Sequence, residues 1–290
     1  MERSSVIAGC MRWGSWGAQF TTEQYSNLIH QCIDNGITTF DHADIYGHYT
    51  TEEEFGRALS QSKINRNNIH LITKFGIQLV SDIRSNHTIK SYNTSAAHIN
   101  QSVEQSLRNF RTDYIDTLLI HRPDPLMNIE EIVVSMELLL ASGKVLQFGV
   151  SNFLPHQVEL FRKYIQTKYN QIELSLTQTT PLYDGTLDYA FLNNIAIMAW
   201  SPMGQGLFSG ENHLYKEAIL KVINSLAIKY NCQPSQIPIA WLNMLPCKPT
   251  SIIGSTKIER IKEAKEAINI KLDREDWYLL LQAATGKEVA

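Results

Sequence analysis

Four polar residues in this sequence are suited to proton-transfer chemistry. Asp41, Lys74 and His121 each follow a short apolar run, and Tyr46 lies five residues after Asp41. A cationic Lys74 close to Tyr46 would stabilise the tyrosinate and lower the phenol pKa from its reference value of about 10. Tyr46 could then act as a general acid near neutral pH. Asp41 could hold Lys74 charged and oriented, and His121 could hydrogen-bond a substrate carbonyl oxygen as negative charge develops there, with no metal ion required.

Each of these residues alone has a structural explanation. Asp41 could cap a turn, Lys74 could be a solvated charge, and His121 could be a hydrogen-bonded structural histidine. Their shared position favours function, because the carboxyl ends of parallel strands meet at one face of an α/β barrel, where active sites occur. A buried carboxylate and a buried ammonium are also costly unless they are paired.

The apolar runs alternate with segments of helical period, which indicates a repeated strand–helix unit. The predicted strands are residues 36–40, 70–73, 115–120, 145–150, 195–199 and 251–253. Continuous apolar strands indicate a parallel sheet buried on both faces. No linker or low-complexity segment divides the chain. We therefore predict an α/β fold, a (β/α)8 TIM barrel, with residues 1–290 as one domain.

Several local signals refine this prediction. Thr51 and Glu54 have the spacing of a capping box for the helix after Tyr46, and Gly143 is a natural helix stop. Residues 81–93 are polar and weakly patterned. We expect them to form a long loop at the carboxyl face of the barrel, where such loops contribute to substrate specificity.

Composition excludes several classes of partner. The 290 residues carry 26 Lys and Arg against 29 Asp and Glu, a formal charge of -3, without the basic stripe that nucleic-acid binding needs. No segment reaches the roughly 18 apolar residues of a membrane helix, and no signal peptide is evident. The cysteines lack metal-ligand or disulfide spacing, so a reducing cytoplasm fits best. They are Cys10, Cys32, Cys232 and Cys247.

An ordered set of motifs resembles the aldo-keto reductase family over nearly the whole chain. The motifs are FDHADIYG, LITKFG, YIDTLLIHRPDP, GKVLQFGVSNF, NQIELSL, MAWSPMGQG and SIIGSTKIERIKEA. They are most similar to a bacterial oxidoreductase branch of the family. The resemblance implies Asp41, Tyr46, Lys74 and His121 as a catalytic tetrad, and NADPH-dependent reduction of a small-molecule aldehyde or ketone. Hydride would reach the carbonyl carbon while Tyr46 protonates the oxygen.

The same resemblance implies a set of cofactor-binding residues. Ser151, Asn152 and Gln171 would hold the nicotinamide carboxamide, and Trp200 would stack on the ring with Ser201 beside it. The pyrophosphate would lie against the backbone of Gly204, Gln205 and Gly206, and Ser255 would bind it at the start of a final helix. Lys257 and Arg260 would bind the 2′-phosphate, and Glu263 the adenine.

Structural explanations exist for these residues too. Ser151 and Asn152 could cap the helix before Pro155, Trp200 could belong to the core, and Lys257 with Arg260 could form a solvated helix face. Residues 204–210 superficially resemble a Rossmann glycine loop, but their GxGxxxG spacing and setting do not fit that fingerprint. We therefore reject a doubly wound dinucleotide domain.

Two other functions compete with reduction. Lys74 could form a Schiff base with a carbonyl substrate, as in an aldolase. Some members of the resembled family are channel-associated subunits, so an NADPH-binding regulatory protein with little turnover is the second alternative. The aldolase hypothesis leaves Lys257, Arg260 and Trp200 unexplained. The intact tetrad favours an enzyme over a regulatory protein with little turnover. No obligate protein partner is expected.

The resemblance is imperfect in places. We expect the family's N-terminal hairpin to be short or absent, and Ala264 stands where many relatives have an asparagine near adenine. The substrate pocket is expected to include Trp13, Trp16, Tyr49, Phe75 and Arg122. Arg122 could attract an anionic substrate or pair with Asp124, and the sequence favours neither.

Overall fold

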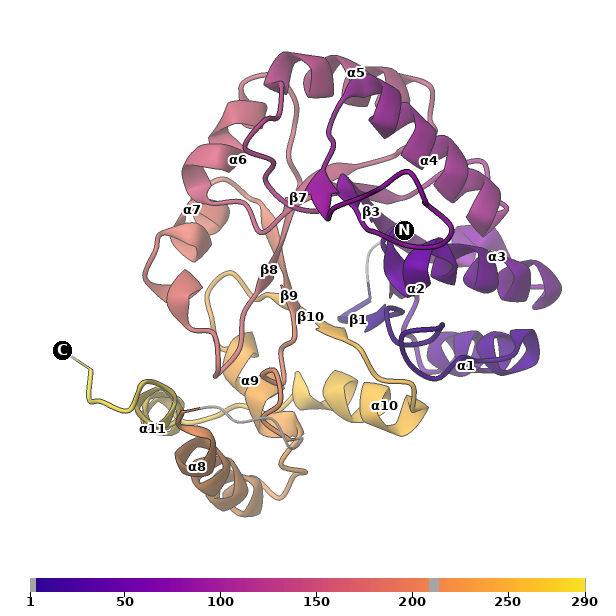
Figure 1. Cartoon of the computed structure of the whole chain (residues 1–290). Helices are drawn as coiled ribbons and strands as arrows, with labels where there is room; N and C mark the ends of the chain where they lie inside the picture. The colour runs from indigo at the N-terminus through magenta and orange to yellow at the C-terminus, as the bar shows by residue number, and fades with distance from the viewer. Residues whose placement is uncertain (1–3, 209–213, 290) are drawn as a thin grey trace.

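A closed parallel β-barrel forms the centre of the computed structural model, which describes residues 4–208 and 214–289 (Figure 1). Going round the barrel, the strands follow the order β1-β2-β3-β6-β7-β8-β9-β10. Their bounds are Val6–Gly9, Thr39–Asp41, His70–Phe75, Thr117–Ile120, Phe148–Ser151, Tyr169–Glu173, Ala196–Trp200 and Thr250–Ile253. This topology confirms the predicted (β/α)8 TIM barrel and rules out the doubly wound fold.

Helices surround the barrel in Figure 1, and α8 packs against α11 outside the ring. The helices are α1 Thr22–Asp34, α2 Tyr46–Tyr49, α3 Thr51–Gln61, α4 Ala96–Phe110, α5 Ile129–Ala141, α6 Pro155–Arg162, α7 Thr186–Leu192, α8 Lys216–Lys229, α9 Gln236–Asn243, α10 Ile258–Ala267 and α11 Arg274–Thr285. Two 3₁₀ turns, η1 Arg66–Asn68 and η2 Thr180–Leu182, complete the elements. Within the described ranges, no helix combines the length and apolar character needed to cross a membrane.

All six predicted strands are present, but two barrel strands were missed. The first strand predicted, residues 36–40, begins only at Thr39. The missed strands are β1 and β8, and β8 was missed because Asn170 and Gln171 are polar yet buried. A strand that carries polar side chains into a barrel mouth gives no continuous apolar signal.

Three local expectations need correction or comment. Thr51 and Glu54 do not form a capping box: the N-cap of α3 is Thr50, which makes no side-chain cap, and Glu54 instead accepts a hydrogen bond from Tyr25. The helix after Ser255 is not the final one, because α11 follows α10. Gly143 follows α5 at a φ of +73°, as expected of a helix stop.

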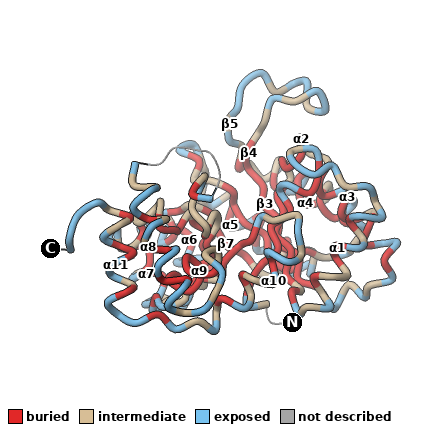
Figure 2. Tube along the Cα trace, turned by 90° about the horizontal axis from the view of Figure 1, so that it is seen from below, coloured by how far each residue is buried: buried red, intermediate tan, exposed pale blue. Residues whose placement is uncertain are grey.

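The barrel interior is filled by apolar side chains from alternate positions of the strands. They are Ile7, Ile72, Leu119, Tyr169, Met198 and Ile252. Such layers make the barrel a packed core with no central pore. Figure 2 shows this buried centre, with exposed segments confined to the periphery and the loops.

A short hairpin stands above the carboxyl ends of the strands (Figure 2). It consists of β4 Ile77–Gln78 and β5 Ser91–Tyr92, which pair antiparallel between β3 and α4. The predicted long loop at residues 81–93 therefore lies where we expected it. Its antiparallel base was not predicted from the sequence.

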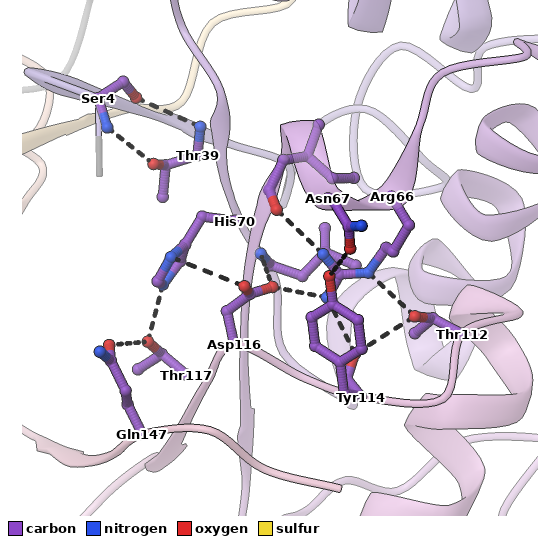
Figure 3. Close-up of polar contacts among 12 residues, drawn as sticks. Ser4, Thr39, Arg66, Asn67, His70, Thr112, Tyr114, Asp116, Thr117 and Gln147 are labelled. Carbon is purple, nitrogen blue, oxygen red and sulfur yellow. Dashed lines mark hydrogen bonds and ion pairs between the residues drawn. The ribbon is translucent and has the colours of Figure 1, made fainter. Parts of the chain in front are cut away.

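The opposite end of the barrel, which we call the floor, holds a polar network around Arg66 (Figure 3). The guanidinium donates to the Asp116 carboxylate at 2.6 Å, to the Thr112 hydroxyl at 3.0 Å and to the Ile69 and Tyr114 carbonyls. Asp116 also accepts from the backbone N–H of Leu71 at 2.9 Å. The network therefore ties together the amino ends of β3 and β6.

Candidate active site

The four predicted catalytic residues meet at the carboxyl face of the barrel, which we call the mouth. Asp41 ends β2, Lys74 lies near the end of β3, His121 follows β6, and Tyr46 begins α2. All four are buried, and Lys74 is only 1% exposed. The structure thus brings these residues together as the strand-end pattern predicted.

Lys74 is the centre of this cluster. Its Nζ donates to both Asp41 carboxylate oxygens at 2.8 Å, to the His42 carbonyl at 2.7 Å and to the Tyr46 hydroxyl at 3.2 Å. An ammonium group has three protons, so these acceptors use all of its donors. The hydroxyl proton of Tyr46 has no acceptor among the described residues, so the phenol can donate to a ligand.

The electrostatics differ from the expectation for Tyr46. Burial raises the pKa of Tyr46 above its ordinary value, and the charge of Lys74 opposes this shift without reversing it. Burial would lower the pKa of Lys74, but the charge of Asp41 and the hydrogen bonds with Asp41 and Tyr46 raise it. The expected lowering of the phenol pKa is therefore wrong for the free protein, because burial outweighs one cation. Tyr46 remains protonated and Lys74 remains charged.

His121 lies next to Tyr46, with ring centroids 6.1 Å apart in an edge-to-face arrangement. Burial, followed by the charges of Lys74, Arg122 and Lys90, lowers the pKa of His121 well below its ordinary value. Neither ring nitrogen has a hydrogen-bond partner in the part of the chain that the structure describes. A neutral imidazole with an unused N–H can donate to a carbonyl oxygen.

A chain of hydrogen bonds joins the predicted nicotinamide-binding residues to this cluster. The Trp200 indole donates to Asn152 at 3.0 Å, the Asn152 amide donates to the Ser151 hydroxyl at 2.7 Å, and that hydroxyl donates to the Gln171 carbonyl at 2.9 Å. The Gln171 side-chain amide then donates to Asp41 Oδ1 at 2.8 Å. The link from Gln171 to Asp41 was not predicted.

The backbone around these residues turns sharply. Asn152 and Ser201 have positive φ angles of 61° and 50°, which are uncommon outside glycine. Gly204 and Gly206 also have positive φ, at 74° and 69°. The alternative in which Ser151 and Asn152 cap the next helix is wrong, because α6 has Leu154 as its N-cap and Gln157 accepts the Leu154 N–H.

The residues predicted to bind the far end of a dinucleotide lie around the start of α10. The Ser255 hydroxyl accepts the Lys257 N–H at 3.1 Å, and the Ser255 carbonyl accepts the Trp13 indole N–H at 3.0 Å. Lys257 and Arg260 are exposed, and neither side chain forms an ion pair with any described residue. Glu263 accepts a hydrogen bond from Ser235 at 3.0 Å, so its adenine contact stays a prediction.

The predicted pocket residues divide into two groups. Trp16 lies against Tyr46, with ring centroids 6.0 Å apart, and the hydroxyl of Tyr49 accepts the Leu79 N–H of the hairpin. Trp13 and Phe75 are instead buried in the core, at 0% and 1% exposure, so their assignment to an open pocket is wrong. Sequence position near the tetrad did not reveal which way these rings point.

Beyond these residues, the sequence did not single out Glu173. This residue ends β8 and is paired in register with Trp200 on β9, at the mouth. Burial raises the pKa of Glu173, and the charge of Arg122 opposes that shift. Its position directly before Leu174 in NQIELSL, at the end of a strand, was the available signal.

A closed parallel barrel with a buried Tyr–Lys–Asp–His cluster at its mouth has the architecture of a barrel enzyme. Residues 5–284 match the model of the aldo/keto reductase family. The chain is 44% identical to the uncharacterized oxidoreductase YcsN of Bacillus subtilis, covering 100% of this chain and 97% of the relative. It is 39% identical to a 6-dehydroglucose reductase of Agrobacterium fabrum, covering 100% and 97%.

A solved structure agrees with this relationship. The glycerol dehydrogenase of Gluconobacter oxydans superposes with a TM-score of 0.86 at 26% identity, covering 100% of this chain and 95% of that one. The chain belongs to the aldo/keto reductase family. It is therefore an oxidoreductase barrel, and members of this family act on small molecules with nicotinamide cofactors.

Proposed function

We propose that this protein reduces aldehydes or ketones to alcohols with NADPH, with Tyr46 as the proton donor. The observation that carries the proposal is the Tyr46 hydroxyl, which accepts from Lys74 at 3.2 Å while Lys74 is held by both oxygens of Asp41. The phenol keeps a proton that has no acceptor in the described part of the protein. This is the state a general acid needs before substrate arrives.

The residues divide the reaction between them. Tyr46 gives its proton to the carbonyl oxygen, and the charge of Lys74 stabilises the tyrosinate that remains. Asp41 keeps Lys74 charged and fixed, and Gln171 holds Asp41 through a 2.8 Å hydrogen bond. Neutral His121 donates a hydrogen bond to the same oxygen and orients the substrate. The carbonyl carbon would receive a hydride from NADPH when the cofactor is bound.

The residues present fit such a cofactor. The Asn152 amide donates to the Ser151 hydroxyl, which donates to the Gln171 backbone carbonyl, while the Gln171 side chain donates to Asp41 of the tetrad. A Cβ added at Gly254 would meet no atom within 4 Å, so the backbone before α10 is open to a close ligand. The exposed cations of Lys257 and Arg260 would hold a 2′-phosphate.

The structure disfavours the aldolase alternative. A Schiff-base lysine needs a neutral amine, usually obtained by lowering its pKa. Lys74 has a raised pKa, and its three protons are already donated to Asp41, His42 and Tyr46.

A regulatory role with little turnover is disfavoured because the tetrad is complete and Tyr46 is poised to donate. All four cysteines are free thiols, and the assignment to a reducing cytoplasm stays a prediction.

The proposal is tested by following NADPH absorbance with purified protein and a panel of aromatic, aliphatic and sugar-derived aldehydes. We expect aldehyde-dependent oxidation of NADPH, and slower oxidation of NADH at equal concentration. NADPH binding without turnover on any carbonyl would support the regulatory alternative. Retention of a borohydride-trapped substrate on Lys74 would support the aldolase instead.

A further inference from the structure

Arg122 is the cation closest in sequence to the tetrad, directly after His121, and it lies at the mouth. Its guanidinium carbon is 5.6 Å from the ring centroid of Trp200, over the end of β9. The residue is half-buried. Arg122 therefore lies beside Trp200 at the mouth and is partly open to solvent.

Apart from the Trp200 ring, the Arg122 guanidinium has no hydrogen-bond or ion-pair partner among the residues that the structure describes. Asp124 accepts instead from the Leu126 N–H at 2.8 Å and the Thr94 hydroxyl at 3.3 Å. The charge of Arg122 affects the pKa of Glu173. No ion pair within 4.0 Å joins these two residues in the described structure, however. The pairing of Arg122 with Asp124, one of the two sequence-based hypotheses, is therefore wrong.

The hairpin above the mouth adds further positive charge. Arg84 lies over the Tyr49 ring, 5.1 Å from its centroid, and exposed Lys90 directly precedes β5. Neither forms an ion pair within the described ranges. Among acids on this side, Asp82 is exposed on the same hairpin, and burial raises the pKa of Asp44. The charges of Arg122 and Lys90 both lower the pKa of His121, so both residues lie within electrostatic range of the tetrad.

We propose that the carbonyl substrate carries a carboxylate remote from the reacting carbon, and that Arg122 binds this carboxylate, with Lys90 attracting it at the rim. The inference rests on the proposed function and names its substrate class. A planar guanidinium matches a carboxylate with two parallel hydrogen bonds. A monoanion suits the site better than a phosphate dianion, because the Glu173 carboxyl, which interacts with the charge of Arg122, already brings negative charge to the mouth.

Two substrates of nearly equal size test this proposal. 4-Carboxybenzaldehyde carries the charge, and methyl 4-formylbenzoate lacks it. With NADPH saturating, we expect kcat/KM for the carboxylate to exceed that for the ester by about tenfold or more, since a charge-assisted hydrogen bond contributes about 1.5–3 kcal/mol. The preference should fall as salt concentration rises.

Substitution of Arg122 separates recognition from chemistry. Arg122→Gln should raise KM for the carboxylate substrate about tenfold or more while leaving the ester within about twofold. Arg122→Lys should raise KM for the carboxylate substrate less than Arg122→Gln does. Lys271→Gln removes an exposed positive charge from the segment between α10 and α11 and serves as the matched control, with no change expected for either substrate.

The outcomes are distinguishable. Equal kcat/KM for the two substrates, or an equal loss for both in Arg122→Gln, would overturn the carboxylate assignment and leave the reductase proposal intact. A rise in KM for NADPH in Arg122→Gln, with unchanged substrate preference, would assign Arg122 to the cofactor and also overturn it. Absence of turnover on both aldehydes and on the wider panel would instead refute the proposed function.

Discussion

Two buried polar clusters occupy opposite ends of the same barrel, and they differ in what they leave unused. At the floor, Arg66 donates to Asp116, Thr112 and two carbonyls, and the protein itself supplies every partner (Figure 3). At the mouth, Lys74 is equally saturated, yet the proton of Tyr46 and both nitrogens of His121 lack partners in the described chain. The network around Arg66 is complete within the protein, whereas the cluster at the mouth leaves polar groups free to bind a ligand.

The cations show the same difference. Arg66 is paired with Asp116 at 2.6 Å and also stacks on the Tyr114 ring, 4.0 Å from its centroid. Arg122, Lys257 and Arg260 form no ion pair with any residue in the described ranges. An arginine that donates four hydrogen bonds to the protein stabilises the fold, whereas one without an ion pair beside a buried reactive cluster is available to an anionic ligand.

The largest expected effect comes from removing the unused proton. Tyr46→Phe should lower kcat by about 10²–10⁴-fold, the usual contribution of a general acid. The ring remains, so packing against Trp16 and the thermal midpoint should be unchanged. Stopped-flow NADPH oxidation and thermal unfolding measure the two quantities.

The matched control removes a hydroxyl at the floor. Tyr114→Phe loses a hydrogen bond to Asn67 at 2.9 Å and should leave kcat unchanged within about twofold. If Tyr46→Phe turned over as fast as the native protein, Tyr46 would not be the proton donor, and the contrast between the two ends would fail.

The converse experiment disrupts the polar network around Arg66 at the floor. Asp116→Ala leaves Arg66 without its carboxylate, and removal of one partner of a buried pair destabilises by about 3 kcal/mol. The low end of the usual range applies because the Arg66 side chain is 17% exposed. Urea unfolding should show this loss, while kcat/KM at 25 °C stays within about twofold of the native value. A large loss of activity without loss of stability would show that the floor is coupled to the site.

The sequence predicted which residues lie at the mouth better than it predicted the hydrogen bonds that join them. Asp41, Lys74 and His121 were identified because each follows a strand, and closure of the barrel brings such positions together whatever the details of packing. The bond from Gln171 to Asp41 spans 130 residues and depends on the exact inward direction of β8. No local pattern encodes that direction when the strand itself is polar.

Two other failures have the same physical origin. Trp13 was expected in the pocket, but it packs edge-on against Phe40 and near Tyr25 in the core. The sign of the Tyr46 pKa shift depends on the balance of burial against one neighbouring charge. Both are properties of three-dimensional packing, which residue types and spacing do not fix.

A smaller effect is expected at the unpaired cations beyond the mouth. Arg260→Met should raise KM for NADPH about tenfold, equivalent to about 1.4 kcal/mol, and leave KM for NADH unchanged, because only NADPH carries the 2′-phosphate. Lys262→Met, on the same helix α10 and also exposed, is the control and should change neither value. Equal effects on both cofactors would mean that Arg260 does not read the phosphate.

The smallest expected change is in the pH profile of the native protein. The pKa of His121 lies well below its ordinary value of 6.5, so the imidazole stays neutral as pH falls through that value. The pKa of Tyr46 lies above 10.0, so the phenol keeps its proton as pH rises toward that value.

Reductive kcat/KM should therefore be flat from about pH 6 to about pH 9.5 and fall only at higher pH, since this parameter reports groups on the free enzyme. Circular dichroism over the same range verifies that the fold persists. An acid limb centred near pH 6.5 would show that His121 gains a proton in the folded protein. The buried His121 would then take up a proton as readily as a solvent-exposed histidine does.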